Sequence, residues 1–303
     1  MAIVNTVLGP VSINQLGVTY IHEHLYVIPD ELQRYYAYTL DIPEKSIEET
    51  KYFQQAGGNT IVDLTPLAYG RNVEALREIS LKAGINVVCV TGFHKDLWLP
   101  RWFNELSESE IETELCHEIE EGIGYYKVKP GAAKLGTSLN EVTSRERRSF
   151  AMVVPLMRDY KIPIITHCDK GTMGHEQLDL FEKYGFSLEH VCLSHTDLTM
   201  DFEYMRTLCE RGAFLSIDHI GRDLANRDQK HVELIAKLIQ AGCSDRLCLS
   251  GDMGKKDYFV SYGGKPGLAY ILSDLRDYLL KYISEEEYFK MLVDNPRRIF
   301  DWN

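Results

Sequence analysis

Short apolar runs alternate along the whole chain with longer stretches in which apolar residues return every three or four positions. The runs are rich in β-branched residues, and this composition is typical of buried strands. They predict eight strands, at residues 18–27, 59–66, 85–94, 131–138, 162–169, 191–197, 213–221 and 246–254.

The stretches between the runs have the spacing of amphipathic helices, and several end in glycine, which often terminates a helix. The predicted helices occupy residues 46–58, 72–84, 109–122, 144–160, 175–185, 201–212 and 231–242. Regular strand and helix repeats with nearly continuous apolar strands indicate a parallel sheet closed into an α/β (β/α)8 TIM barrel. A doubly wound open sheet is the alternative, but no strand-to-helix turn carries the glycine-rich fingerprint of a dinucleotide site.

The two ends of the chain fall outside this alternation. Residues 4–17 predict a short hairpin that closes the barrel floor, and residues 285–302 predict a terminal helix and tail. No linker, low-complexity tract or block of charge divides the chain, so we expect one domain over residues 1–303.

Charge and composition narrow the class of partner. The net charge of -12 argues against a nucleic-acid or anionic membrane surface and favours a small-molecule substrate. The N-terminus lacks the pattern of a secretion signal and no segment is long and apolar enough to cross a bilayer, so the expected location is the cytoplasm. The seven cysteines form no CxxC pair, and those in apolar runs are expected to be reduced core residues.

The first run contains two histidines, in the stretch GVTYIHEHLYV. Because strand side chains alternate between faces, His22 and His24 are expected to share one face, with Tyr20 in the same row. Glu23 would lie on the opposite face, where we expect it to pair between strand and helix. Two adjacent imidazoles suggest a metal site, although a histidine within a core is more often structural.

Further polar residues stand where the other predicted strands end, which is where a barrel of this kind binds its ligands. Each one alone has an ordinary structural explanation, but their joint placement predicts a single axial pocket able to hold metal. They are Lys134 on the fourth strand, His167 on the fifth, His195 on the sixth, Asp218 and His219 on the seventh, and Asp252 on the eighth.

With these residues in view, the sequence resembles the phosphotriesterase-like branch of the amidohydrolase superfamily, which includes the phosphotriesterase homology proteins and the phosphotriesterase-like lactonases. The motifs that carry the resemblance are IHEH, KLGTS, ITHCDKGTMGHEQLD, VCLSHTD and LSGD. The resemblance implies a binuclear metal-dependent hydrolase with His22, His24 and Asp252 at one metal ion and His167 and His195 at the other.

The same resemblance implies that Lys134 is carboxylated (N6-carboxylysine) and bridges the two ions. A protonated amine beside two divalent cations would be repelled, whereas a carbamate supplies two anionic oxygens. An unmodified Lys134 turned away from the site is the alternative. Histidine and carboxylate ligands suit zinc, with manganese, cobalt or iron as alternatives.

The expected chemistry is hydrolysis of an ester, most often a lactone in this family, by attack of a metal-bridging hydroxide. Asp252 is expected to be the catalytic acceptor of the proton. We predict a phosphorylated or otherwise anionic sugar lactone because cationic and polar groups follow the last strands. The predicted substrate-binding residues are His94, His219, Arg222, Lys255, Lys256 and Tyr258.

Aromatic residues after the third strand offer a different feature. Trp98, Trp102 and Phe103 could form an apolar lid over the pocket, and Phe93 stands near the same strand end. Arg71, after the second strand, is expected to brace loops rather than to bind substrate.

Three other functions stay open at this point. One is an acyl-homoserine lactone lactonase with promiscuous phosphotriesterase activity. Another is a mononuclear amidohydrolase, against which Lys134 argues because a bridge is needed only for two metals. The last is a non-catalytic barrel that binds metal or ligand. Relatives are often homodimers, and the resemblance implies the same here.

Overall fold

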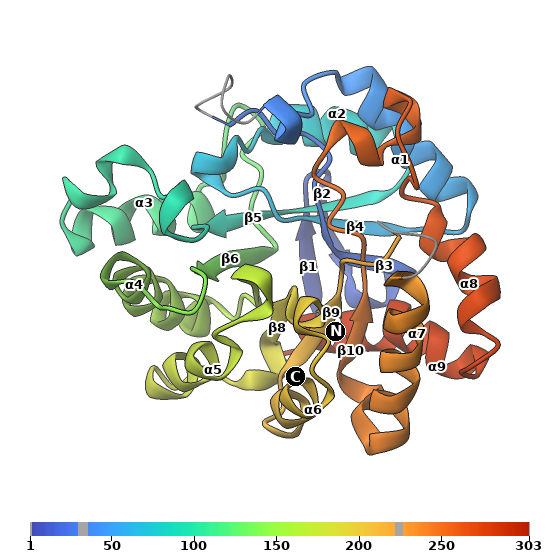
Figure 1. Ribbon diagram of the computed structural model, residues 1–303. Helices are drawn as coiled ribbons and strands as arrows, with labels where there is room; N and C mark the ends of the chain where they lie inside the picture. Colours follow the sequence, from blue (N-terminus) through green and yellow to red (C-terminus); the bar gives the residue numbers. More distant parts are fainter. Residues whose placement is uncertain (1, 30–35, 222–226, 303) are drawn as a thin grey trace.

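A ring of eight parallel strands surrounded by helices forms the body of the protein, in a computed structural model that describes residues 2–29, 36–221 and 227–302 (Figure 1). The strands pair in chain order from first to last, as the repeat pattern predicts. Their bounds are β3 Thr19–Glu23, β4 Thr60–Asp63, β5 Asn86–Gly92, β6 Ala132–Thr137, β7 Ile164–Cys168, β8 Val191–Ser194, β9 Phe214–Ile217 and β10 Leu247–Leu249.

The helices lie outside the ring and cover the strands (Figure 1). Their bounds are α1 Pro43–Gln55, α2 Val73–Ala83, α3 Glu108–Glu120, α4 Ser144–Tyr160, α5 Gly174–Lys183, α6 Phe202–Glu210, α7 Arg227–Leu238, α8 Asp274–Leu279, α9 Glu285–Phe289 and α10 Asn295–Phe300. Every predicted strand and helix is present, and the predicted TIM barrel is confirmed. The predicted strands run longer than the observed ones because their apolar patterns continue into the buried loops that follow.

The floor of the barrel is closed by both ends of the chain. Strands β1 Ile3–Thr6 and β2 Gly9–Ser12 form the predicted antiparallel hairpin. Val4 of β1, Leu16 after the hairpin and Phe300 of α10 pack against side chains inside the barrel. The interior itself is filled by apolar residues from successive strands, among them Ile21, Val62, Val90, Ile165, Cys192, Phe214 and Cys248.

The face assignment of the first strand was wrong at Tyr20. The pairing of β3 with β4 shifts register between Tyr20 and Glu23, so the simple alternation of faces breaks there. Tyr20 points outward onto Phe53 of α1, with ring centroids 4.6 Å apart, and its hydroxyl donates to the carbonyl of Leu268 at 2.9 Å. It therefore does not share a row with His22.

Arg71 braces the structure as expected. Its guanidinium bonds both carboxylate oxygens of Glu118 in α3, at 2.5 and 3.0 Å, and donates to the carbonyl of Val90 in β5 at 2.8 Å. These hydrogen bonds of the Arg71 guanidinium connect the loop after β4 to the neighbouring strand β5 and helix α3.

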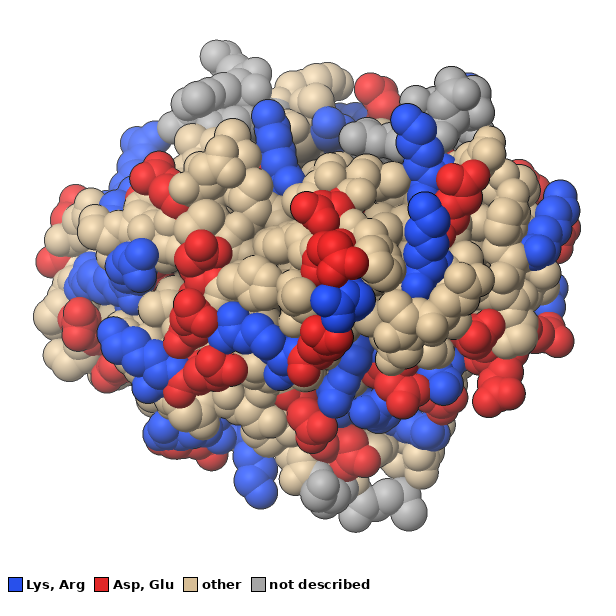
Figure 2. All heavy atoms as spheres, turned by 60° about the horizontal axis from the view of Figure 1, so that its bottom comes forward, with Lys and Arg blue, Asp and Glu red and all other residues tan. Residues whose placement is uncertain are grey.

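All seven cysteines are free, and six of them are buried, in agreement with a reduced core. On the face shown in Figure 2, lysines and arginines are interspersed with aspartates and glutamates. Within the described residues, no helix combines the length and the apolar character that a membrane span requires.

Candidate metal centre

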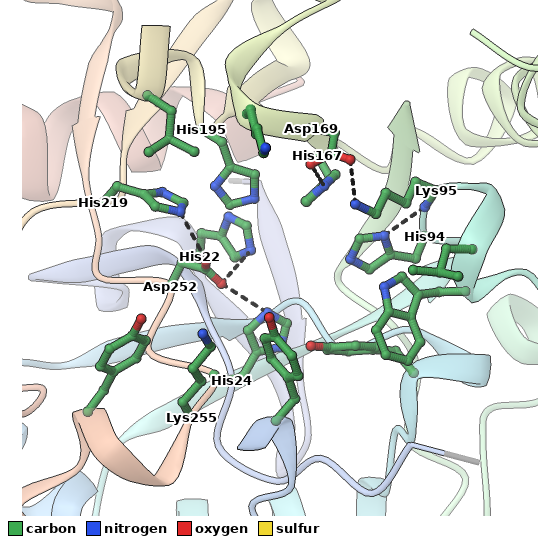
Figure 3. A pocket seen from close by; sticks show the side chains of 18 residues that line it. His22, His24, His94, Lys95, His167, Asp169, His195, His219, Asp252 and Lys255 are labelled. Atoms are coloured by element: carbon green, nitrogen blue, oxygen red, sulfur yellow. Dashed lines mark hydrogen bonds and ion pairs between the residues drawn. The ribbon is translucent and has the colours of Figure 1, made fainter. Parts of the chain in front are cut away.

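A cavity of about 360 Å³ opens where the strands end, and histidine is the residue type that dominates its wall. Figure 3 shows these side chains converging from several strands. The histidines that line the cavity are His22, His24, His94, His167, His195 and His219, and Asp252 lies among them.

The first predicted ligand set comes together as the sequence suggests. The Nε2 atoms of His22 and His24 lie 3.5 and 3.2 Å from Oδ1 of Asp252, which is close enough for all three to bind one ion. Both imidazoles are buried, and Nδ1 of His24 contacts the Thr65 hydroxyl at 2.8 Å, which orients that ring.

Lys134 reaches this group from β6, and its side chain is fully buried. Its amine lies 3.3 Å from Nε2 of His22 and 3.4 Å from the carbonyl of Thr166. Burial lowers the pKa of Lys134 to about 8, although the carboxylates of Asp252 and Asp218 favour its charged form. The uncharged amine, which is the form able to react with carbon dioxide, is therefore far more populated near neutral pH than in an ordinary exposed lysine.

His167 and His195 form a second pair beside the first group. Their ring centroids are 4.6 Å apart. Burial, followed by the neighbouring His94, holds the pKa of His167 well below its usual value, so the ring is neutral. Its Nε2 atom is buried and makes no hydrogen bond to any residue that the structure describes. An unsatisfied lone pair of this kind is what an added cation would satisfy.

Asp218 organises the centre, and sequence reasoning noted it without assigning it a role. Oδ1 accepts from the backbone N–H and Nδ1 of His195 and from Nδ1 of His219, at 3.1, 2.9 and 3.1 Å. Oδ2 lies 3.0 Å from Nδ1 of His22. Burial opposes ionisation, but the electrostatic attraction of His195 and the hydrogen bonds from these three histidines outweigh it and hold the pKa of Asp218 well below its usual value.

The ionised Asp218 fixes which nitrogen of each ring can bind metal. A carboxylate can only accept hydrogen bonds, so Nδ1 of His22 and of His195 must carry the hydrogens. The neutral ring of His22 then has an unprotonated Nε2 atom, which faces Asp252 and Lys134. Neutral imidazoles, an aspartate and an unsatisfied buried nitrogen fit a divalent metal ion.

Four of the predicted substrate-binding residues line the cavity, namely His94, His219, Lys255 and Tyr258. Lys256 does not: its amine pairs with Asp41 at 3.0 Å and lies over the ring of Tyr36. The predicted Arg222 lies outside the described residues.

The predicted aromatic lid is present only in part. Trp98 lines the cavity and packs edge-on against Tyr69, with centroids 4.6 Å apart. Phe103 is fully buried against Phe93 instead, and Trp102 lines a separate cavity beside α3. Neither residue lines the histidine cavity, because Phe103 is part of the core and Trp102 shares its cavity with Ile111 and Leu115 of α3, so that part of the prediction was wrong.

Two lysines that sequence reasoning missed also line the cavity. Lys95 pairs with Asp169 at 2.6 Å, and Lys170 stands next to that aspartate on the loop after β7. Their position directly after the third and fifth predicted strands could have identified them from the sequence.

Glu23 corrects a third expectation. Its carboxylate accepts the backbone N–H groups of Gly251 and Met253, at 2.5 and 2.9 Å, and these residues belong to the loop after β10 rather than to a helix. These residues flank Asp252, so Glu23 contacts the loop that carries a predicted ligand.

The strand ends of this parallel barrel bring histidines, a buried lysine and an aspartate into one cavity. This combination is typical of metal-dependent barrel hydrolases. The chain belongs to the phosphotriesterase family, whose model matches residues 2–300. The protein is accordingly a hydrolase that acts on ester bonds.

Individual relatives are similar over almost their whole length. A phospho-furanose lactonase of Mycoplasmopsis synoviae is 30% identical over an alignment of 318 residues. The alignment covers 97% of this chain and 90% of that protein. The structure of a lactonase from Listeria monocytogenes matches with a TM-score of 0.94 and 29% identity over 100% of both chains. The Escherichia coli phosphotriesterase homology protein, complexed with phosphate in its active site, matches with a TM-score of 0.90 and 28% identity over 95% of this chain and 99% of that one.

Proposed function

We propose that the protein is a binuclear metal-dependent lactonase that opens a phosphorylated or otherwise anionic sugar lactone. The observation that carries the proposal is Lys255 at the cavity wall. Its amine lies over the rings of Tyr38 and Tyr258, 4.6 and 5.6 Å from their centroids, and forms no ion pair with any described carboxylate. It is available to an anionic substrate, in contrast to Lys95 and Lys256, each of which already has an aspartate partner.

The names of the relatives agree with an anionic lactone. One is a phospho-furanose lactonase, and another holds phosphate in its active site. The cavity of about 360 Å³ suits a small sugar derivative, and its polar wall of histidines and lysines does not favour a long acyl chain.

Two zinc ions would be held by the residues described above. His22, His24 and Asp252 would hold one ion, and His167 and His195 the other. When bound, such ions acidify water towards neutrality and polarise the lactone carbonyl. The family resemblance and the donor set support this assignment.

Lys134 would be the shared ligand after carboxylation. Its neutral amine would attack carbon dioxide, forming an N–C bond and releasing one proton, so that the side chain becomes an anionic carbamate. The buried position 3.3 Å from His22 Nε2 and the pKa of about 8 both favour this modification.

Asp252 would accept the proton of the attacking water and return it to the leaving oxygen as the ring opens. His219 stands behind it, with Nε2 4.0 Å from Oδ2 of Asp252 and Nδ1 3.1 Å from Oδ1 of Asp218. His219 is therefore placed to relay a proton from Asp252 once the two groups close to hydrogen-bond distance. The cytoplasmic location and the homodimer expected from sequence stay predictions.

The test is metal content together with initial rates on a panel of phosphorylated sugar lactones, plain sugar lactones, acyl-homoserine lactones and one phosphotriester. We expect about two metal ions per chain, as in two-metal hydrolytic sites, and a preference for the phosphorylated lactones. Preference for long acyl chains would overturn the anionic substrate. Metal without turnover of any lactone would overturn the lactonase and favour an amide substrate or a binding role.

A matched pair of variants tests the role of Lys255. Lys255→Ala removes one charged hydrogen-bond donor, which is worth about 1.5–3 kcal/mol, or about 10- to 150-fold in kcat/KM for the phosphorylated lactone. Lys256→Ala removes the same charge from the neighbouring position but outside the cavity, so its kcat/KM should be unchanged. Equal losses in the two variants would show that only the overall charge of the loop matters.

A further inference from the structure

The loop after β10, residues 250–254, is hydrogen-bonded to β3 through three successive backbone amides. The N–H groups of Gly251 and Met253 donate to the carboxylate of Glu23, at 2.5 and 2.9 Å, and that of Asp252 donates to the carbonyl of His22 at 3.1 Å. No ladder of strand pairing joins β10 to β3 in the described sheet, so these bonds close the barrel at this seam.

Asp252 has an unusual backbone conformation between the two amides that Glu23 holds. Its φ is +45°, in the left-handed region that residues other than glycine adopt rarely. A conformation of this kind persists where the surrounding contacts determine it. The carboxylate that this turn carries lies 3.5 and 3.2 Å from Nε2 of His22 and His24 (Figure 3).

We propose that Glu23, the middle residue of the His-Glu-His motif, is a positioning residue that sets the direction of the Asp252 carboxylate. Its backbone lies between the two histidines, while its side chain holds the amides on both sides of Asp252. One residue thus joins the two halves of the first ligand set. The inference rests on the role assigned to Asp252 in the proposed function.

Burial makes this contact rigid. The Glu23 side chain is fully buried, so its two amide donors have no water to replace them. Gly251 also shows how close the approach is. A Cβ atom at this position would lie 2.9 Å from Oε1 of Glu23 and 2.8 Å from the Met253 side chain.

The chain offers a matched control in Glu49 of α1. Its buried carboxylate accepts the amides of Ser261 and Leu268, at 2.8 and 2.9 Å, further along the segment that follows β10. Glu49 therefore makes the same kind of contact to the same region of the chain, but not to residues beside Asp252.

The experiment compares Glu23→Gln with Glu49→Gln. In each variant one carboxylate oxygen becomes an NH2 group that faces a buried N–H, so both should lose similar thermal stability. Because supporting contacts of this kind are worth about 10- to 100-fold, Glu23→Gln should lower kcat by that factor with KM little changed. Glu49→Gln should leave kcat at the wild-type value.

Hydrogen exchange of the metal-free protein gives a readout that does not depend on activity. Glu23→Gln should speed exchange at the amides of residues 251–253, and Glu49→Gln at those of residues 261 and 268. Chelator competition should show weaker metal retention in Glu23→Gln alone. Gly251→Ala disturbs the same contact from the loop and should reproduce the loss of kcat if Glu23→Gln does not fold.

A double variant separates positioning from general destabilisation. If Glu23 acts through Asp252, then Glu23→Gln should cause little further loss of kcat when added to Asp252→Asn. A full additional loss, or equal kcat in the Glu23 and Glu49 variants, would overturn the inference. A wild-type protein that turns over no lactone would instead refute the proposed function, and the exchange and metal-retention measurements would still decide the role of Glu23.

Discussion

Replacing Asp218 by asparagine should weaken metal binding while leaving the shape of the site almost intact. Oδ1 of Asp218 receives three hydrogen bonds, two from His195 and one from His219, whereas Oδ2 lies 3.0 Å from Nδ1 of His22. An asparagine keeps more bonds by leaving its oxygen in the Oδ1 position and placing its NH2 group against His22.

That orientation reverses the tautomer of His22. Because Nδ1 of His22 then faces the NH2 group of the asparagine, it must become an acceptor. The Ser194 hydroxyl, 2.8 Å away, can donate to it as well. The ring hydrogen then moves to Nε2, the nitrogen that would bind metal. Restoring the metal-binding tautomer breaks the bond between the asparagine and Nδ1 and leaves two buried donors facing each other, at a cost of about 1–3 kcal/mol, so we expect metal affinity to fall by about 5- to 150-fold.

The assay is competition for metal between the protein and a chromophoric chelator, with thermal unfolding of the metal-free protein measured in parallel. Glu49→Gln serves as the control, because it alters a buried carboxylate that accepts two backbone amides, from Ser261 and Leu268, away from the histidines. An Asp218→Asn variant that binds metal as tightly as the wild type would refute the reasoning about tautomers.

Three further predictions follow from the same geometry. Asp252→Asn should lower kcat far more than it lowers metal content, as measured by elemental analysis beside initial rates; parallel loss of both would contradict a role in proton transfer. Lys134→Met should lose one of about two metal ions, and wild-type protein reconstituted without carbon dioxide should lose the same ion; an unaltered metal content in both cases would exclude the carbamate. Phe53→Ala should cost about 3–5 kcal/mol in urea unfolding because Phe53 is fully buried against Tyr20; a loss below 1 kcal/mol would show that the site collapses around the cavity.

The elements of the fold could be read from the sequence because their signals are local. Helix α4 begins and ends where its pattern predicts, at Ser144 and Tyr160, and a capping box between Thr143 and Glu146 fixes its start. The positions of the predicted metal ligands were also readable, since a parallel barrel brings all strand ends to one face.

The sequence did not reveal how neighbouring residues divide their roles. Lys255 lines the cavity, whereas the adjacent Lys256 pairs with Asp41 outside it. Both lysines look alike in sequence, and only the packing of the loop after β3 against the loop after β10 separates them. The register shift after Tyr20 likewise depends on pairing with β4.

By itself, then, the sequence determined the barrel, its closing hairpin and the set of histidines, lysine and aspartate at the strand ends. Only the tertiary structure decided that Asp218 orients three histidines and that Glu23 holds the loop around Asp252. These contacts join segments as far apart as residues 22 and 218, or 23 and 251. Periodicity and residue type describe a segment on its own, whereas a hydrogen bond between buried groups depends on where two distant segments meet.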